Sequence, residues 1–300
     1  MARAAYLPHP FMAAPNQTGP AFKFPLVIRL FRIVVRSIGL LAPEWAARMA
    51  YRMWFKPGRD KLRDGEAELL AEGRQETVSF EGLRIAIQIW GSGPTVLLVH
   101  GWGDRGSRMA IIATALAKAG FRALAFDAPA HGDSQGWGTS GIQMAALTRS
   151  LADEYGPFTG AITHSFGGVA VNLACRNGLA LDRLVCISPP ADAPRLMTLY
   201  LGMLKLRPAI TERVQEMARE QFGDDIWERL SMYNKPAEMP LPALIVHDRT
   251  DRVALFSEGE RVAASWPNAR MLATDGLGHR RILRDPEVIA QVVAFIAGGG

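Results

Sequence analysis

The chain has 300 residues, of which 49% are hydrophobic and 21% are charged, a composition typical of a globular protein with one large α/β domain or two small ones. Its formal net charge of +5 arises near the N-terminus, because five of the 34 basic residues precede Glu44, the first acidic residue. From Glu44 onward 29 basic residues face 29 acidic ones with no stripe of basic and aromatic residues, which excludes nucleic-acid binding as an interpretation.

The N-terminal region divides into an arm and a helical part. Residues 1 to about 23 are rich in Pro, Ala and polar residues without a sustained period, which predicts an extended arm. Residues 24–56 are apolar and predict two amphipathic helices separated by Pro43, with Arg29, Arg32 and Arg36 on one side of the first. A membrane span and a signal peptide each need an apolar run with few or no charges. These arginines interrupt that run and argue against both interpretations.

Three interpretations of residues 24–56 stay open. The helices could pack on the main domain or on a second subunit, which we favour, or lie on a membrane surface as a basic amphipathic anchor. A transit peptide is the third interpretation. We expect a cytoplasmic protein, with peripheral membrane contact or self-association through residues 24–56 as further expectations, and we assign residues 1–70 to this N-terminal unit.

From Thr77 short apolar runs alternate with helical stretches, which predicts a doubly wound, mostly parallel sheet. Residues 77–80 and 84–90 predict an antiparallel hairpin. Buried strands are expected at 95–100, 122–127, 160–164, 183–188, 243–248 and 269–274. Helices are expected at 108–119, 141–155, 166–177, 258–265 and 286–297. We therefore assign residues 71–188 and 241–300 to one α/β core.

Residues 189–240 separate two consecutive strands by far more than a usual connection. Their sequence is helical and rich in Met and Leu, so they are either an extra pair of surface helices or a lid over a pocket at the carboxyl ends of the strands. We favour the lid. Cys175, in the expected helix 166–177, and Cys186, in the expected strand 183–188, lie in apolar surroundings and indicate neither a disulfide framework nor a metal site.

Ser165 lies in ITHSFGG, where a predicted strand gives way to a predicted helix. A serine there can simply cap the helix, or it can be a nucleophile that needs a histidine base oriented by a carboxylate. Asp251 follows the strand ALIVHD, and His279 lies in a glycine-flanked loop after ARMLAT. The order serine, acid, histidine is the chain order of α/β-hydrolase triads.

From about Thr77 to the C-terminus the sequence resembles α/β-hydrolase-fold proteins of the serine esterase and lipase type. Five motifs carry the resemblance: HGWG at 100–103, FDAPAHGDS at 126–134, THSFG at 163–167, HDRTDRV at 247–253 and GLGH at 276–279. The resemblance implies an α/β-hydrolase fold with a helical lid and a catalytic triad of Ser165, Asp251 and His279. It also implies an oxyanion hole formed by the backbone N–H groups of Trp102 and Phe166.

Further residues of these motifs are expected to support the site. Thr163, His164 and Gly167 surround the nucleophile, and His100 and Gly101 open the oxyanion loop. Asp248 and Asp275 are the alternatives to Asp251 as the acid. We expect His100, His131 and His247 to hold loops by hydrogen bonds, and His164 to point away from Ser165. Thr163 and Ala130 depart from the family pattern, which has glycine at both positions.

The resemblance implies hydrolysis of a carboxylic ester or thioester of a small to medium apolar acyl group through an acyl-enzyme. The expected partner is a small-molecule ester, and neither a metal nor an organic cofactor is expected. Three alternatives remain: an acyltransferase, a perhydrolase, and a ligand-binding homologue without turnover. The feature that motivates the last of these is Thr163, because its branched side chain crowds a turn that usually carries glycine.

Overall fold

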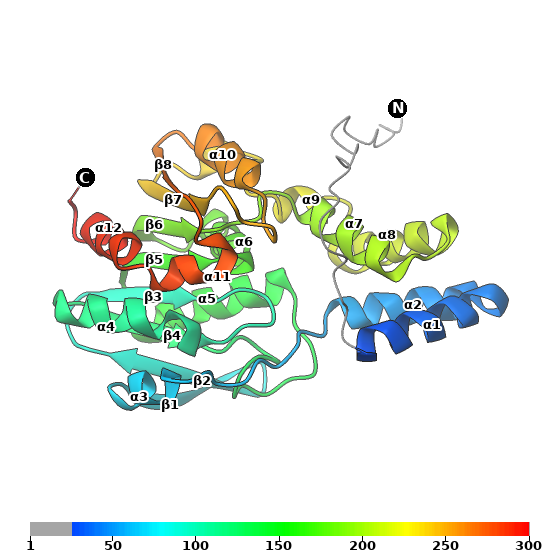
Figure 1. The fold of residues 1–300 in the computed structure, drawn as a ribbon, viewed down its shortest axis with the longest axis horizontal. Helices are drawn as coiled ribbons and strands as arrows, with labels where there is room; N and C mark the ends of the chain where they lie inside the picture. The colour runs from blue at the N-terminus through cyan, green and yellow to red at the C-terminus, as the bar shows by residue number, and fades with distance from the viewer. Residues whose placement is uncertain (1–25, 300) are drawn as a thin grey trace.

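The structure is a computed structural model that describes residues 26–299, so the expected arm at residues 1–23 lies outside the described residues. Its centre is an eight-stranded sheet in the order β1-β2-β4-β3-β5-β6-β7-β8 (Figure 1). The strands are β1 (Arg74–Phe80), β2 (Leu83–Trp90), β3 (Thr95–Val99), β4 (Arg122–Phe126), β5 (Phe158–His164), β6 (Leu181–Ile187), β7 (Ala243–Asp248) and β8 (Ala269–Thr274). β2 is antiparallel to β1 and β4, and the remaining pairs are parallel.

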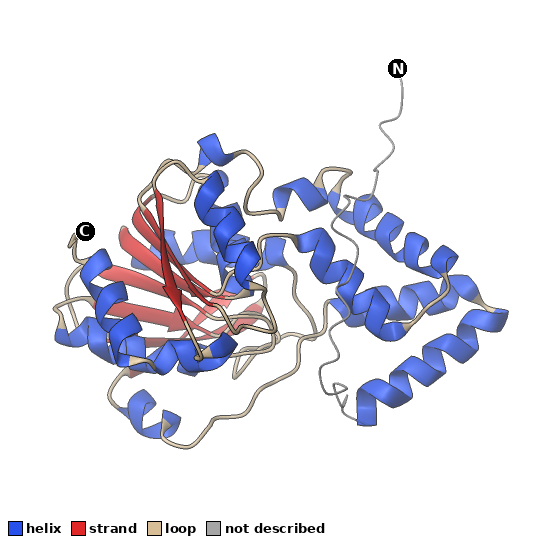
Figure 2. Ribbon diagram, turned by 45° about the horizontal axis from the view of Figure 1, so that its top comes forward, coloured by secondary structure: helices blue, strands red, loops and turns tan. Residues whose placement is uncertain are grey.

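Helices cover both faces of the sheet (Figure 2). One face packs against α5 (Gly141–Tyr155), α6 (Phe166–Arg176) and α10 (Phe256–Ser265). The other packs against α4 (Ala110–Lys118) and α12 (Pro286–Ile296), with the short helices η2 (Gly106–Met109), α11 (Gly278–Arg281) and η4 (Ile282–Arg284) along that side. The central strands are apolar on both faces because both faces are covered. This arrangement confirms the expected α/β-hydrolase fold.

Most expected elements have nearly the observed bounds, and β7, β8 and α5 have them unchanged. β1 begins three residues earlier than expected, because Arg74, Gln75 and Glu76 lie on an edge strand and carry no apolar signal. The sequence analysis did not predict α3 (Glu66–Ala71), which spans the expected boundary after residue 70. The side-chain amide of Gln88 and the indole N–H of Trp90 donate to carbonyl groups at its end, so this short helix is fixed to the core.

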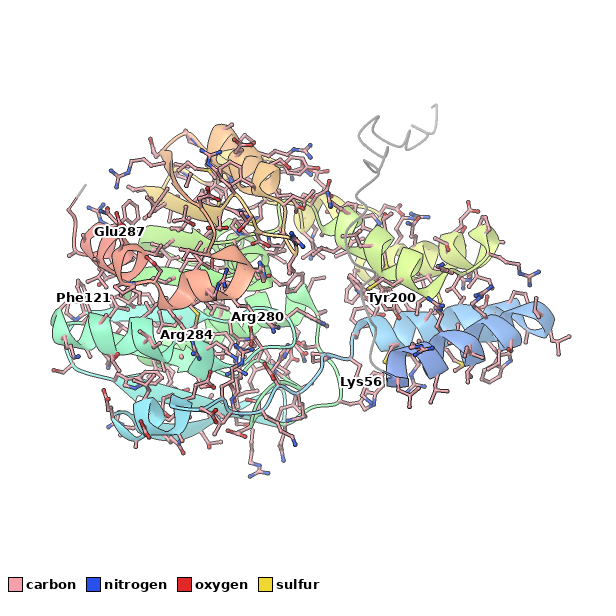
Figure 3. The ribbon with its side chains drawn as sticks, viewed as in Figure 1. Lys56, Phe121, Tyr200, Arg280, Arg284 and Glu287 are labelled. Atoms are coloured by element: carbon pink, nitrogen blue, oxygen red, sulfur yellow. The ribbon has the colours of Figure 1, made fainter. Side chains whose placement is uncertain are left out.

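The N-terminal helices and the insertion form one helical layer beside the sheet, here called the cap. It comprises α1 (Leu26–Leu41), α2 (Pro43–Trp54), α7 (Ala193–Leu204), α8 (Pro208–Phe222) and α9 (Ile226–Arg229), and the short helix η3 (Pro236–Glu238) follows α9 in the chain. α1, α2, α7 and α8 share an apolar core, and the Tyr200 hydroxyl of α7 donates to the Ala50 carbonyl of α2 at 2.7 Å (Figure 3). We favoured packing of these two helices on the main domain or on a second subunit. Within the chain they pack on the inserted helices, whose apolar faces are complementary to theirs.

Candidate active site

Ser165 occupies the turn between β5 and α6, with φ 51° and ψ −125°. A positive φ is rare for a residue with a Cβ atom, and such strained turns occur at functional sites. Gly167 allows the turn, because a Cβ at this position would lie 2.4 Å from the carbonyl oxygen of Val99. Gly101 is equally constrained, since its Cβ would lie 3.0 Å from that of Ser165. The backbone therefore packs tightly around one partly exposed hydroxyl.

Thr163 fits this turn although the related pattern has glycine there. Its side chain is fully buried, and its hydroxyl donates to the Val185 carbonyl of the neighbouring strand at 3.1 Å. The facing position on α6 is Gly168, where a Cβ would lie 3.3 Å from the Thr163 hydroxyl oxygen. The lack of a side chain at Gly168 thus makes room for the branched side chain of Thr163. The strand β5 keeps its regular register with β6.

His279 and Asp251 come together although they are 28 residues apart. His279 lies in α11, a four-residue helix, rather than in the expected loop, and its Nδ1 lies 2.7 Å from Asp251 Oδ2. The other carboxylate oxygen accepts the backbone N–H groups of Val253 and Ala254 at 2.8 and 3.2 Å. Nδ1 is the protonated nitrogen in this arrangement, which leaves Nε2 as the basic one.

His247 also faces this carboxylate. Its Nε2 donates to the Ala254 carbonyl at 3.0 Å and lies 3.5 Å from Asp251 Oδ2. Burial raises the pKa of Asp251, but hydrogen bonds from His247, His279 and Val253 outweigh it, and the pKa lies well below its usual range. Asp251 is therefore a fixed negative charge beside the His279 imidazole.

The alternative acids occupy different environments. Asp248 accepts four hydrogen bonds, from the backbone and hydroxyl of Thr250, the hydroxyl of Thr274 and the backbone N–H of Leu277. These hydrogen bonds hold its pKa well below the usual range and tie the end of β7 to the loop before α11. Asp275 is exposed. Asp251 is the carboxylate that contacts His279, and Asp248 supports the loop that carries it.

His164 connects the serine turn to the histidine turn. Its Nε2 donates to the His279 carbonyl at 2.9 Å, and the two rings lie 4.8 Å apart. Ser165 follows His164 directly, so this contact places α11 against the Ser165 turn. Burial lowers the pKa of His164 to about 3, which keeps the ring neutral.

The two expected oxyanion donors also come together. Phe166 is the first residue of α6, where backbone N–H groups have no partner within the helix and the helix dipole favours negative charge. Trp102 lies in the loop after β3, and its ring packs edge-to-face on the Phe166 ring at 5.3 Å. The loop is therefore held against the helix terminus from which the second donor would come.

His100 and His131 hold the loops around this position. His100 Nδ1 donates to the Gly101 carbonyl at 2.7 Å, and its Nε2 accepts the Ala128 N–H at 3.0 Å. His131 Nδ1 donates to the Pro129 carbonyl, and its Nε2 accepts the Gly103 N–H at 3.0 Å. Each ring uses both nitrogens in the neutral form, as the loop-holding interpretation expects.

We expect these neutral buried histidines to make the fold sensitive to mild acid. Burial lowers the pKa of His100, and lowers those of His131 and His164 to about 3, below the value near 6.5 of an unfolded chain. Between those values the unfolded chain binds more protons, so the free energy of unfolding decreases as the pH falls from about 6.5 toward 3. Asp251 and Asp248 have lowered pKa values, so their contribution is lost only below about pH 4.

Guanidinium titrations at pH 7 and pH 5 measure this effect. A His131→Gln variant, whose side-chain oxygen can reach the position of Nε2 and still accept the Gly103 N–H, should show a smaller decrease in the free energy of unfolding between pH 7 and pH 5. The expected reduction is at most about 1.4 kcal/mol per pH unit, the effect of one proton. An unchanged decrease would show that His131 is not buried in its neutral form.

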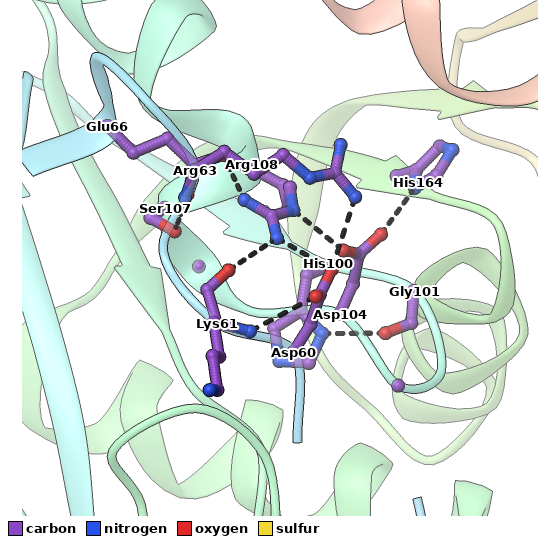
Figure 4. Close-up of polar contacts among 12 residues, drawn as sticks. Asp60, Lys61, Arg63, Glu66, His100, Gly101, Asp104, Ser107, Arg108 and His164 are labelled. Atoms are coloured by element: carbon purple, nitrogen blue, oxygen red, sulfur yellow. Dashed lines mark hydrogen bonds and ion pairs between the residues drawn. The ribbon is translucent and has the colours of Figure 1, made fainter. Parts of the chain in front are cut away.

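The sequence analysis did not predict an ion-pair cluster behind the loop that follows β3 (Figure 4). The guanidinium of Arg108 contacts Asp104 at 3.0 Å, Asp60 at 2.6 Å and Glu66. Asp104 Oδ2 in turn lies 3.9 Å from Nδ1 of His164. The cluster connects the segment after α2 to the loop that follows β3 and to the residue before Ser165. In the sequence only Asp104 and Arg108, four residues apart after HGWG, marked it, because Asp60 and Glu66 are distant in the chain.

Comparisons with known proteins agree with this fold. A model of the alpha/beta hydrolase family matches residues 96–292. A pimeloyl-[acyl-carrier protein] methyl ester esterase of Aeromonas salmonicida is 24% identical, over 72% of this chain and its own full length. A provisionally named non-heme haloperoxidase of Mycobacterium phage D29 is also 24% identical, over 74% of this chain and 94% of its own. Esterase Pf2001 of Pyrococcus furiosus superposes with a TM-score of 0.60 and 22% identity, over 81% of this chain and 97% of its own.

Proposed function

Because the chain belongs to the alpha/beta hydrolase family, we propose that it is a serine hydrolase that cleaves carboxylic esters or thioesters through an acyl-enzyme. The observation that carries the proposal is the 2.7 Å contact between His279 Nδ1 and Asp251 Oδ2, next to the strained turn of Ser165. The relatives named as esterases support the same reaction class.

In the proposed reaction Ser165 Oγ attacks the ester carbonyl while its proton moves to Nε2 of His279. Asp251 holds the imidazole in the required tautomer and stabilises the imidazolium. The carbon–oxygen bond to the alcohol then breaks, and the proton passes from His279 to the departing alcohol. Water repeats the sequence on the acyl-enzyme and releases the acid. The backbone N–H groups of Trp102 and Phe166 would stabilise the tetrahedral oxyanion in both steps.

The acyl group is proposed to be apolar and of small to medium size. Phe166 belongs to an apolar cluster that Trp102 and the cap residues Leu196 and Leu230 also join. Residues 189–240 are proposed to act as the lid, since they supply part of this cluster. An apolar acyl chain gains free energy on leaving water for such surroundings, whereas a charged chain does not.

The test is covalent labelling with a fluorophosphonate, followed by peptide mass spectrometry and a series of p-nitrophenyl esters of increasing chain length. An adduct on Ser165 together with turnover is the expected result, and the series would define the acyl pocket. Folded protein that gives no adduct would contradict the proposal and favour a binding protein.

The p-nitrophenyl ester assay also distinguishes among water, an alcohol and peroxide as the acceptor of the acyl group. The relative named as a haloperoxidase makes peroxide worth including beside alcohols. Products formed from water alone support a hydrolase. Faster acyl transfer to an alcohol would indicate an acyltransferase, and faster transfer to peroxide a perhydrolase.

A further inference from the structure

The first helix of the cap has two apolar faces, of which only one is covered. Val35 on the inner face is fully buried in the core of the cap. The outer face carries exposed apolar side chains, from 47% exposed at Val34 to 92% at Leu41. This apolar stripe consists of Leu26, Leu30, Ile33, Val34, Leu40 and Leu41. Trp45 continues it at the start of α2, with 67% of its surface exposed.

The spacing of the stripe makes it one continuous surface. Its members recur at intervals of three, four or seven residues along α1, which places them on one side of a helix. Continuous exposed apolar patches on soluble proteins usually mark interaction sites, whereas isolated exposed residues do not. We therefore expect the stripe to contact a binding partner, and the neighbouring charges indicate which kind.

A row of arginines flanks the stripe. At 100° per residue, Arg29, Arg32 and Arg36 fall together between the stripe and the buried face. α1 contains no acidic residue, and within residues 26–299 none of the three arginines forms an ion pair. The sequence before α1 adds Arg3 and Lys23 and again no acidic residue. The surface thus combines exposed apolar side chains with uncompensated positive charge.

We propose that the apolar stripe and its arginine row dock the protein on an anionic lipid surface. The stripe would enter the boundary between head groups and acyl chains, while the arginines contact anionic head groups. A second copy of the chain fits less well, because a symmetric contact through α1 brings two basic rows together with no carboxylate on α1 to pair with them. Within the described residues no helix has the length and hydropathy to cross a bilayer, so the helix would lie along the surface.

Docking would also orient the cap. α1 shares its core with α7 of the proposed lid, so a lipid-bound α1 holds the lid close to the membrane. An apolar ester dissolved in that membrane would then be near the proposed lid. This consequence depends on the proposed hydrolase activity, whereas the docking itself does not.

Vesicle co-sedimentation of the full chain tests the proposal without using catalysis. The probes are phosphatidylcholine vesicles with and without phosphatidylglycerol, at low and high salt. We expect binding to the anionic vesicles only, weakened by salt because screening acts on the arginines. Ile33→Glu should weaken binding about tenfold or more. Replacing Arg29, Arg32 and Arg36 with Gln should weaken it about 100-fold and remove most of the salt dependence.

The matched controls make the same kinds of substitution at exposed residues outside α1. Leu62→Glu charges an exposed leucine outside α1, and Arg84, Lys118 and Arg149 replaced with Gln remove three exposed charges from the α/β core. Both controls should bind like the unmodified chain. Circular dichroism melting confirms that each variant is folded.

Three results would overturn the proposal. The first is no binding to anionic vesicles, and the second is equal losses in variants and controls. The third is light scattering that shows a dimer which Ile33→Glu dissociates, because the stripe would then be a contact between copies.

Discussion

Ser165→Ala is expected to lower the kcat for an activated ester by about 10⁴-fold or more while leaving the fold unchanged. The serine hydroxyl makes the covalent bond in the proposed reaction, and no neighbouring group supplies a second nucleophile on the same turn. Alanine is slightly smaller and keeps the backbone of a turn with φ 51°. The measurement is burst and steady-state release of p-nitrophenol at matched concentrations of folded protein.

Ser188→Ala is the matched control for this substitution. Ser188 also has a positive φ, of 50°, is fully buried, and follows the neighbouring strand β6 as Ser165 follows β5. It contacts neither His279 nor Asp251 among the described hydrogen bonds, so its variant should retain turnover. Equal activity of Ser165→Ala and the unmodified chain would eliminate the acyl-enzyme mechanism.

Asp251→Asn should lower kcat by about 10⁴-fold with little loss of stability. An asparagine amide can donate to Nδ1 of His279, which moves the ring proton to Nε2 and removes the base that Ser165 needs. The carboxylate geometry is otherwise kept, because an asparagine oxygen can still accept the Val253 and Ala254 N–H groups. Steady-state kinetics on an activated ester and a thermal melt measure the two effects separately.

The opposite pattern is expected for Asp248→Asn. Asp248 accepts four hydrogen bonds. In asparagine an NH₂ group replaces one carboxylate oxygen, so the groups that donate to that oxygen lose their acceptor and face another donor. The free energy of unfolding should fall by about 1–3 kcal/mol, whereas turnover of the folded variant should fall less than tenfold. If Asp248→Asn abolished turnover and Asp251→Asn did not, the assignment of the acid would be wrong.

Chain order and tertiary contacts contribute differently to the assignment of the candidate catalytic residues. Ser165, Asp251 and His279 follow strands in an order that a sequence can reveal, because parallel strands bring their carboxyl ends to one edge of the sheet. The sequence analysis favoured Asp251 as the acid but left Asp248, three residues earlier, as an alternative. The hydrogen bonds distinguish them, since Asp251 reaches His279 and Asp248 holds Leu277.

The departures from the family pattern were also resolved by packing. Thr163 looked too large for its turn, but whether it fits depends on the facing position of α6, which is Gly168. Ala130, the second departure, has φ 66°, so the backbone keeps the conformation that glycine adopts easily. For Thr163 the residue alone predicts a conflict and its neighbour decides the outcome, whereas Ala130 adopts the left-handed conformation itself.

By itself, the sequence determined a doubly wound, mostly parallel sheet, because apolar runs of strand length and alternating helices leave few ways to build a buried parallel sheet. The α/β-hydrolase fold followed from the resemblance of its five motifs, whereas the order of the strands in the sheet came from the structure. The sequence also located the candidate nucleophile and base, because their motifs follow strand ends. Only the tertiary structure decided that α1 and α2 pack on the inserted helices and that Arg108 joins Asp60, Glu66 and Asp104. Such contacts connect residues far apart in the chain, so they depend on complementary surfaces that no local pattern records.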